Sequence, residues 1–452
     1  MNFLRRHSSH ILLYLGLFAL GLGLCAVLVP PEMRAVAQQL IGFPDSDFRA
    51  HQVRPVVLAV MCFLPALGGV IYTFGDTLDR YITRQFLAIF GICFIALFTI
   101  WLLMDLTDKI GEFKNSQGVL WTIGVFYLGR APSIILMLLP YSLLLSLLYS
   151  LGKLSSNHEI IAMIQSGRGV VRITLPLMVT GILCTLLSMG LNYQWAPIAE
   201  GGVDDFFTKN SGKKVNEANK VLYRNAEDRR LWMIGAFPKN YQNGQALLDV
   251  EVTTTDAKRQ IQSRLRADSA LWHRDTRQWT FENPLICRML PDQPPLFKTL
   301  EGPLTIDGWS ETPWQLIKPG LSAAYLGVPD LNSWLQANYR HQQFANPSPY
   351  FTQWHYRWAL PFSCIVTVLL ATPLAIHFSR RNTGSGVFLA VSLSGMMLFM
   401  GDVILTFGEA GLLRPWLAAW LPNIIFASIG FYFFRRRILG RPIYQSLRQL
   451  FS

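Results

Sequence analysis

Residues 86–104 read FLAIFGICFIALFTIWLLM, nineteen consecutive residues without a charged side chain. A helix needs about 20 apolar residues to cross the hydrocarbon core of a bilayer. This stretch therefore predicts a membrane-spanning helix over about residues 84–105. Other apolar segments predict further spans over about residues 11–30, 55–74, 122–151, 173–194, 354–378, 386–407 and 413–434, which makes eight in all.

The composition agrees with a polytopic membrane protein. Hydrophobic residues make up 51% of the chain and charged residues 15%, a balance typical of this class. The first apolar segment follows Arg5, Arg6 and His7, as in a secretory signal, but no small-residue cleavage site is clear after it. Pro30-Pro31 comes next instead. We therefore interpret it as a retained span.

Lys and Arg are distributed unevenly between the two sides of the predicted spans. The side of the N-terminus carries the larger number, including Arg80, Arg84 and the run Arg435-Arg436-Arg437. Such an excess is typical of cytoplasmic loops, so both termini are predicted to lie in the cytoplasm. Much of the net charge of +12 then reflects topology and requires no nucleic-acid partner.

A polar, strand-rich insert, residues 196–350, separates the fifth and sixth spans. Strands are predicted at residues 220–224, 231–237, 247–255, 261–272 and 278–282. Within residues 264–271, Leu265, Ala267, Ser269 and Leu271 alternate with Arg264, Arg266, Asp268 and Ala270, which suits a sheet with one buried face. Short strands at this spacing predict a sandwich or an open jellyroll outside the membrane.

Trp272 and Trp279 flank a tight turn within this insert. We expect them to pack across a hairpin, with a ligand-binding role as the alternative. Cys287 is the one cysteine of the insert, so no disulfide within the domain is expected and its own core must stabilise it.

The loop after the fourth span contains the segment EIIAMIQSG, residues 159–167. Ser156 and Glu159 have the spacing of a capping box, so a helix is predicted to begin there, and Gly167 is placed to end it. The helix is too short to span and has an apolar face of isoleucines and Met163. Such a face must be buried against the membrane, its own helical bundle or a partner protein, and the bilayer interface and a partner protein are the two main interpretations.

Four cations lie near the ends of spans on the side opposite the N-terminus: Lys109, Lys114, Arg130 and Arg357. Cations at one membrane surface either hold lipid phosphates through charge-assisted hydrogen bonds or simply extend into the interface. The residues alone support both interpretations.

Asp402 lies within the seventh predicted span. A charge at the bilayer centre costs roughly 2.5–3.5 kcal/mol on insertion scales, so this carboxylate is expected to face protein or water. A hydrogen bond to a neighbouring helix is the favoured interpretation, and a proton relay is the alternative.

The sequence contains no complete motif of the enzyme families considered. The P-loop pattern Gly-x-x-x-x-Gly-Lys-Ser/Thr does not occur. His158-Glu159 begins like a zinc-protease motif, but Ala162 stands where the second histidine is required. Phe399 replaces the first glycine expected before an intramembrane aspartyl-protease pair at Gly401-Asp402. No catalytic set, metal site or cofactor is predicted, and the residues favour a transporter subunit or a membrane-anchored receptor.

Several short motifs occur in a fixed order from Asp79 to the C-terminus. They are Leu78-Asp79-Arg80-Tyr81-Ile82, Asp105-Leu106-Thr107-Asp108, Pro132 with Pro140, the segment from Glu159 to Gly167, Trp195-Ala196-Pro197, Arg357-Trp358-Ala359-Leu360-Pro361-Phe362, Gly395 with Asp402, and Leu421-Pro422-Asn423. In this order and around this insert, the chain resembles the lipopolysaccharide export permeases LptF/LptG, also called YjgP/YjgQ. The Asp79-Arg80-Tyr81 opening favours the LptG half.

The resemblance implies a multi-pass protein of the inner membrane with six family spans and a periplasmic β-jellyroll between the third and fourth. It implies an LptF–LptG pair acting on a cytoplasmic ATPase dimer, LptB. The pair would extract lipopolysaccharide from the outer leaflet and pass it to LptC/LptA-like bridge proteins. A membrane-anchored envelope receptor or scaffold without transport activity is the alternative.

The resemblance also implies roles for individual residues. Residues 156–167 become a coupling helix that meets the ATPase, through Glu159, Ile160, Met163, Ile164 and Gly167. The four cations become candidate contacts to lipid phosphates. The expected domains are an extra two-span extension at 1–78, spans at 79–195, the β domain at 196–350, spans at 351–437 and a cytoplasmic tail at 438–452.

Overall fold

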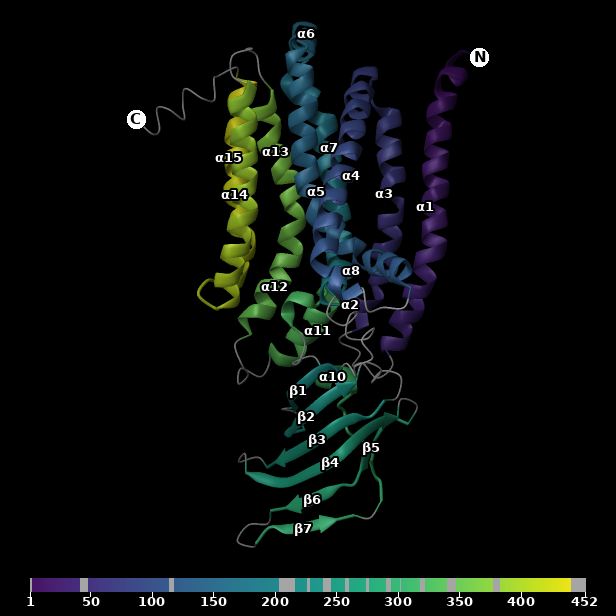
Figure 1. Ribbon diagram of the computed structural model, residues 1–452, viewed down its shortest axis with the longest axis vertical. Helices are drawn as coiled ribbons and strands as arrows, with labels where there is room; N and C mark the ends of the chain where they lie inside the picture. Colours follow the sequence, from purple (N-terminus) through teal and green to yellow (C-terminus); the bar gives the residue numbers. More distant parts are fainter. Residues whose placement is uncertain are drawn as a thin grey trace. The chain divides into compact units, whose positions relative to one another are not determined.

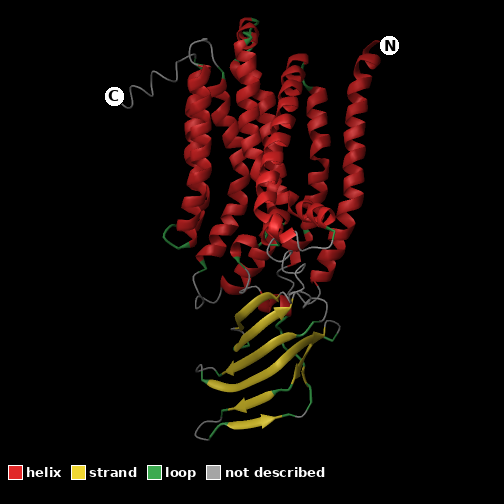
Figure 2. Ribbon diagram, viewed as in Figure 1, coloured by secondary structure: helices red, strands yellow, loops and turns green. Residues whose placement is uncertain are grey.

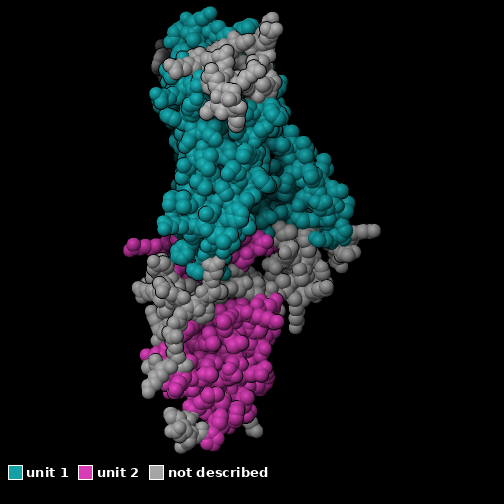
Figure 3. Space-filling view, turned by 90° about the vertical axis from the view of Figure 1, so that its left-hand side faces the viewer, with its two compact units in different colours: residues 1–31, 54–200, 346–452 teal, residues 32–53, 201–345 magenta. Residues whose placement is uncertain are grey.

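The computed structural model describes residues 2–40, 48–113, 118–202, 216–225, 228–238, 245–256, 260–273, 276–289, 294–300, 302–317, 322–339, 347–376 and 383–439. The chain forms two compact units, which Figure 3 distinguishes by colour. The first comprises residues 1–31, 54–200 and 346–452, and the second residues 32–53 and 201–345. The predicted tail beyond Leu439 lies outside the described residues.

Helices, most of them long, make up the first unit, and the last turns of the N-terminal helix belong to the second (Figures 1 and 2). In chain order they are α1 (Asn2–Leu40), α3 (Arg54–Phe74), α4 (Thr77–Phe113), α5 (Val119–Ser156), α6 (Glu159–Gln165), α7 (Val170–Tyr193), α8 (Trp195–Gly201), α12 (Ser348–Ala359), α13 (Ser363–Ala375), α14 (Thr383–Glu409) and α15 (Pro415–Ile438). Eight stretches of the described residues are long and apolar enough to cross a membrane. They coincide with the eight predicted spans, so that prediction is confirmed.

The core of the helical unit lies mainly among α5, α7 and α13. Leu147 and Leu151 of α5, Leu177 of α7 and Val368 of α13 are fully buried there. Gly181 allows α7 to approach α13 closely, because a Cβ at this position would lie 2.8 Å from Val368 Cγ2. These helices are therefore apolar on more than one face, which is why hydropathy alone identified them.

The sixth span is interrupted between α12 and α13 by the short 3-10 helix η5 (Leu360–Phe362). Pro361 has no N–H to donate to the carbonyl of Arg357 one turn earlier. The Asn192 side-chain amide donates to that carbonyl instead, at 2.7 Å, and the Asn423 amide donates to the carbonyl of Ala359 at 2.6 Å. Side chains from α7 and α15 thus satisfy the interrupted backbone, as burial in a membrane requires.

The two additional spans are formed by α1 and α3, and α3 packs closely against α7. A Cβ on Gly190 of α7 would lie 2.2 Å from Met61 Sδ of α3. On the other side of α3, the rings of Phe63 and Phe18 of α1 lie 5.5 Å apart. A Cβ at Gly21 of α1 would lie 2.9 Å from the carbonyl of Cys62. Glycines therefore allow α1 to lie close to α3, and α3 to lie close to α7.

Strands of the second unit form one antiparallel sheet (Figure 2). They are β1 (Asn216–Asn225), β2 (Arg230–Pro238), β3 (Leu247–Thr255), β4 (Ile261–His273), β5 (Gln278–Glu282), β6 (Leu285–Arg288), β7 (Leu296–Thr299) and β8 (Leu304–Ile306). The order is β1-β2-β3-β4-β5-β8, and β4 also pairs with β6, which pairs with β7. The five predicted strands correspond to β1–β5, whereas β6, β7 and β8 were not predicted because three or four residues carry too little alternation.

The alternating pattern in β4 is confirmed over most of its length. Leu265, Ala267 and Ser269 are buried, and the residues between them are exposed. Ala270, predicted to face outward, is fully buried. Its flanking partners explain this, because it lies opposite Leu247 of β3 and, on the other side, a buried phenylalanine of β5.

The two tryptophans predicted to pair do so, since Trp272 lies directly opposite Trp279 in the β4–β5 ladder. Trp279 is fully buried, its ring lies 5.0 Å from that of Trp232, and its indole N–H donates to the carbonyl of Glu311 at 2.8 Å. The packing interpretation therefore accounts for Trp279, whose indole N–H already has a hydrogen-bond partner.

Shorter helices complete the second unit: α2 (Phe48–Gln52), α10 (Pro313–Ile317), η4 (Ala323–Tyr325) and α11 (Val328–Tyr339). His51 of α2 is fully buried, and its Nε2 lies 3.4 Å from Ser333 Oγ and 3.9 Å from Asp330 Oδ1 of α11. The segment that connects the two additional spans therefore contributes a buried side chain to the unit that contains the sheet.

Candidate functional site

The predicted coupling helix is α6, which continues past the end of α5 in Figure 1. The capping-box prediction is wrong, because Ser156 is the last residue of α5 and its hydroxyl donates to the carbonyl of Lys153. The helix begins at Glu159 after His158, which has a positive φ of 61°. This left-handed residue therefore interrupts the helix between α5 and α6, and α6 has seven residues.

Gly167 ends α6 as predicted. Its φ is +90°, its N–H donates to the carbonyl of Ile164, and the N–H of Arg168 donates to that of Met163. These two bonds form a Schellman motif, which needs a left-handed residue at the position that glycine occupies.

The apolar residues of α6 mostly face the interior of their own unit. Ile160 is fully buried and Met163 is 7% exposed, both within the main helical core, against which Ile164 also packs. Glu159 accepts a hydrogen bond from the hydroxyl of Tyr81 on α4, at 2.9 Å. Four of the five predicted coupling residues thus hold α6 on the bundle, and Gly167 shapes its end.

The face of α6 that remains exposed is small and polar. Ala162, Gln165 and Ser166 are exposed, as are Asn157 and His158 just before the helix. Any partner that meets α6 would contact these residues, while the buried ones would transmit its displacement to α4 and α5.

Two of the four predicted cations meet at one carboxylate. Asp105 of α4 accepts hydrogen bonds from Lys109 Nζ at 2.8 Å, from the Tyr127 hydroxyl at 2.9 Å and from Arg130 Nη1 at 3.0 Å. Arg130 Nη2 also donates to Glu200 Oε1 at 3.2 Å. We call these five residues the Asp105 network; its two cations and two carboxylates balance.

Aromatic rings cover the cations of the Asp105 network. The Arg130 guanidinium lies 5.2 Å from the ring centre of Trp101 and 5.7 Å from that of Phe126, and Lys109 Nζ lies 5.2 Å from the latter. The Arg130 side chain is 10% exposed, whereas that of Glu200 is 50% exposed. Glu200 is therefore the partner that an incoming anion would displace most readily.

The other two predicted cations, Lys114 and Arg357, are not part of the Asp105 network as the structure describes it. Lys114 lies outside the described residues. Arg357 is 7% exposed on α12, and its Nη1 lies 3.4 Å from Oδ1 of Asn192, the residue that also caps its carbonyl. Arg357 thus lies at the interrupted sixth span and has a local role in joining α12 to α7.

Asp402 is exposed on α14. Within the described residues, no hydrogen bond or ion pair to its carboxylate is recorded, while its main-chain carbonyl accepts the Thr406 hydroxyl at 3.0 Å. An exposed carboxylate inside an apolar span needs water or another protein beside it, because lipid would leave it unsolvated.

The comparison with known families agrees with this arrangement. Residues 80–436 match the family described as lipopolysaccharide export system permease LptF/LptG. The chain belongs to this family. Members of the LptF/LptG family are the permease of the lipopolysaccharide export system, so the chain is a multi-pass transport protein and its resemblance to the family is confirmed. A search of curated proteins finds no match.

The LptF/LptG match starts at the beginning of α4, which places α1 and α3 before it. It contains α6, the Asp105 network, both amides at the interrupted span and the whole sheet. Asp105 and Asn423 stand in the family motifs of the sequence, but the partners of these residues, and the roles of Tyr127, Glu200 and Asn192, could not be predicted from it. One signal was present, since Asp105 precedes Lys109 by four residues, the spacing of a helical ion pair.

Proposed function

We propose that this chain is one half of a permease pair that extracts lipopolysaccharide from the outer leaflet of the inner membrane. The observation that carries the proposal is the family match over residues 80–436, which includes six spans and the inserted sheet. In this proposal the termini are cytoplasmic, the sheet is periplasmic, and a cytoplasmic ATPase dimer of the LptB type hydrolyses ATP. The sheet passes the lipid to bridge proteins of the LptC/LptA type.

In the coupling step, α6 transmits the movement of the ATPase to the helices of the permease. The partner ATPase contacts the exposed residues Ala162 and Gln165, and the buried Ile160 and Met163 carry the motion into the core. The Tyr81–Glu159 bond ties the same helix to α4. Because packed helices shift as rigid bodies, a displacement of α6 alters the arrangement of α4, α5 and α7 together.

The lipid-binding step uses the Asp105 network. A lipid phosphate replaces the half-exposed Glu200 as the partner of Arg130, and Lys109 supplies a second charge. This exchange keeps a charge-assisted hydrogen bond on the guanidinium at every stage, so no buried cation is left unpaired. Arg357 contributes positive charge at the interrupted span.

The coupling proposal is tested by enlarging the exposed face of α6. Ala162→Trp should sharply reduce co-purification of the ATPase and the amount of lipid extracted per ATP hydrolysed in proteoliposomes, because the added ring blocks contact without entering the core. The control is Leu439→Trp, at a position 57% exposed beyond α15. Undiminished capture and coupling by Ala162→Trp, and by Gln165→Trp, would refute docking at α6.

The lipid proposal is tested by a pair of variants with opposite expected effects. Arg130→Gln should weaken photocrosslinking of lipopolysaccharide to α4 and α5, whereas Glu200→Gln should strengthen it, because the competing carboxylate is gone. Unchanged crosslinking in both would mean that the Asp105 network serves helix packing alone. A protein that binds lipopolysaccharide but never moves it with the ATPase present would favour the receptor alternative.

A further inference from the structure

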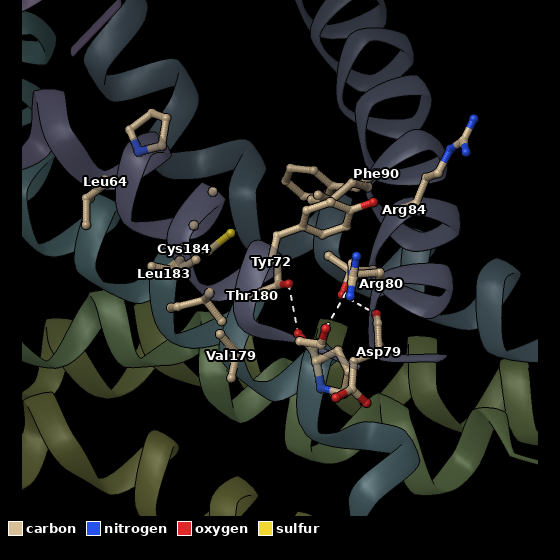
Figure 4. A pocket seen from close by; sticks show the side chains of 18 of the residues that line it. Leu64, Tyr72, Asp79, Arg80, Arg84, Phe90, Val179, Thr180, Leu183 and Cys184 are labelled. Carbon is tan, nitrogen blue, oxygen red and sulfur yellow. Dashed lines mark hydrogen bonds between the residues drawn. The ribbon is translucent and has the colours of Figure 1, made fainter. Parts of the chain in front are cut away.

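An apolar pocket with a volume of about 910 Å³ lies among α3, α4 and α7. Leu64, Leu87 and Leu183 contribute to its walls, one from each helix, and Leu17 of α1 completes its edge. Figure 4 shows these walls, with Tyr72 between the side chains of α4 and those of α7. The volume is near the upper end of the range of roughly 300–1,000 Å³ that small-molecule sites occupy.

The length of the pocket suits one half of a bilayer. Along α7 its lining extends from Leu175 to Leu187, which is about 18 Å at a rise of about 1.5 Å per residue. The hydrocarbon layer of one leaflet is about 15 Å thick, half of the whole core. An extended acyl chain of that leaflet therefore has the length to fill it.

The pocket opens sideways toward the surroundings of the helices. Three of its lining residues, Ile71, Leu87 and Leu175, are 41%, 45% and 42% exposed. They belong to three different helices, and each lies within a stretch that is long and apolar enough to span a membrane. In a membrane this opening faces lipid, and an apolar occupant can enter from the bilayer without crossing water.

The end of the pocket near the start of α4 is charged. Asp79, Arg80 and Arg84 line it. Asp79 accepts a hydrogen bond from Arg172 of α7 at 2.9 Å, so its charge is already balanced. Arg80 donates its Nε to the carbonyl of Gly75 at 2.9 Å, a contact that fixes the guanidinium at this end (Figure 4).

Two further arginines of the described residues, Arg168 and Arg172, lie beside the aspartates at this end. Oδ2 of Asp76 lies 3.2 Å from Nη2 of Arg172 and 3.6 Å from Nη2 of Arg168. Because Arg172 also contacts Asp79, these two arginines balance the charges of the two aspartates. The next carboxylate, Glu159, is bonded to Tyr81, which follows Arg80 on α4. Successive helical positions point about 100° apart, so that bond lies on another face. Among these described residues four arginines lie with two aspartates, so the sum of the charges at this end of the pocket is positive.

The wall formed by α3 lies outside the family match, which begins at residue 80. Met61 of α3 occupies the space above Gly190, and Gly68 lies within 3.4 Å of the Leu183 side chain, measured from a Cβ built on the glycine. These contacts hold α3 against α7 at two levels. The pocket thus depends on a helix outside the family match.

We propose that this pocket binds one anionic phospholipid from the leaflet next to Arg80 and Arg84. One acyl chain fills the space between α3 and α7, and the headgroup phosphate lies beside the two arginines. The bound lipid seals the additional helices to the transport core. The site is separate from the Asp105 network, toward the opposite end of α4, and it retains its lipid whether or not lipopolysaccharide is moved.

The test uses the full chain in nanodiscs without ATP or lipopolysaccharide. The probe is phosphatidylglycerol with a photoreactive diazirine in one acyl chain, and labelled peptides are located by mass spectrometry. Labelling is expected in the pocket segments of α3, α4 and α7. Val179→Trp should remove most of it by filling the pocket, whereas Ile182→Trp, on a side chain 49% exposed on another face of α7, should not.

A second measurement tests the headgroup contact. Replacing Arg80 or Arg84 by Gln should lower the preference for phosphatidylglycerol over a matched phosphatidylcholine probe about fivefold each, the effect of one cation near a lipid surface. Arg435→Gln, on an exposed cation of α15, is the control. Should Val179→Trp fail to fold, Leu87→Trp fills the pocket from α4.

Each other outcome overturns the proposal. Labelling spread evenly over all the helices, or unaffected by the filling variants, would show that no lipid occupies the pocket. Equal labelling by both headgroups in the parent chain would remove the role of the arginines. Recovery of a partner helix crosslinked at this place would identify a protein as the occupant. Because the assay needs no transport, its failure leaves the proposed function untouched.

Discussion

Replacing Asp105 by Asn gives the sharpest test of how the Asp105 network holds α4 against α5. The substitution keeps the shape of the side chain but removes the charge that accepts hydrogen bonds from Lys109, Tyr127 and Arg130. Glu200 alone would then face two cations. We expect the variant to fold with a markedly less stable helical unit.

The magnitude follows from burial and from what Asn can still do. Removing one partner of a buried ion pair costs about 3–5 kcal/mol. The Asp105 side chain is 16% exposed and that of Lys109 is 19% exposed, so water relieves part of the loss, and the Asn carbonyl keeps one acceptor. We therefore expect a loss of about 2–3 kcal/mol. At about 2–4 °C per kcal/mol, the apparent melting temperature falls by about 4–12 °C.

The chain carries its own reporters for this assay. Cys62, Cys184 and Cys364 are buried free thiols, so a thiol-reactive fluorescent dye in detergent reports the opening of the helical unit on heating. The matched control is Asp108→Asn, three residues further along α4 at an exposed position. It should melt within about 1 °C of the parent, since exposed charges contribute little.

One result would refute the reasoning. If Asp105→Asn melts like the Asp108 control, the contacts around Asp105 contribute no net stability. The double variant with Arg130→Gln distinguishes the causes, because contacting residues show interaction energies of about 0.5–3 kcal/mol in such cycles. Additive effects would mean that Asp105 and Arg130 act independently despite the 3.0 Å contact.

Three further predictions concern other parts of the chain. Gly408→Ala should lower the free energy of unfolding by about 1–3 kcal/mol, since the added Cβ would lie 2.4 Å from the Cβ of Ala418 on α15. The control Gly401→Ala, whose Cβ would have nothing within 4 Å, should melt at or above the parent temperature. Equal melting temperatures of the two variants would disprove the contact. Tyr81→Phe should speed hydrogen exchange in α6 by about 3–10-fold through loss of the Glu159 bond, and unchanged exchange would mean that core packing alone holds α6. Glu311→Gln should loosen the sheet by about 3–5 kcal/mol, since this fully buried carboxylate binds an arginine bidentately; limited proteolysis of the full chain measures it, and an unaltered pattern would contradict it.

Those parts of the fold that depend on local patterns could be predicted. The eight spans were found because a bilayer demands a long apolar segment wherever a chain crosses it. The five longer strands were found because a half-buried sheet imposes alternation, and the tryptophan pair followed from its symmetric position about one turn. The failures were local too, since the left-handed residue His158 replaced the expected capping box and β6 to β8 were too short to show a period.

The candidate site could be predicted by residue type but not by partner. Lys109 and Arg130 were two of the four cations predicted near the ends of spans, yet nothing local says that both would bind Asp105. Ile160 and Met163 were read as a surface for a partner, and they are buried in their own core. An apolar helical face predicts burial but does not specify which surface covers it.

The sequence by itself determined that this is a membrane protein with a strand-rich insert, since hydropathy and alternation act over neighbouring residues. The order of motifs also identified its family. Only the tertiary structure decided that Asn192 and Asn423 complete the interrupted span, that Glu200 joins Arg130, and that α3 leaves a charged, apolar pocket beside α4. Each of these depends on side chains far apart in sequence, whose distances are set by helix packing and not by any local preference.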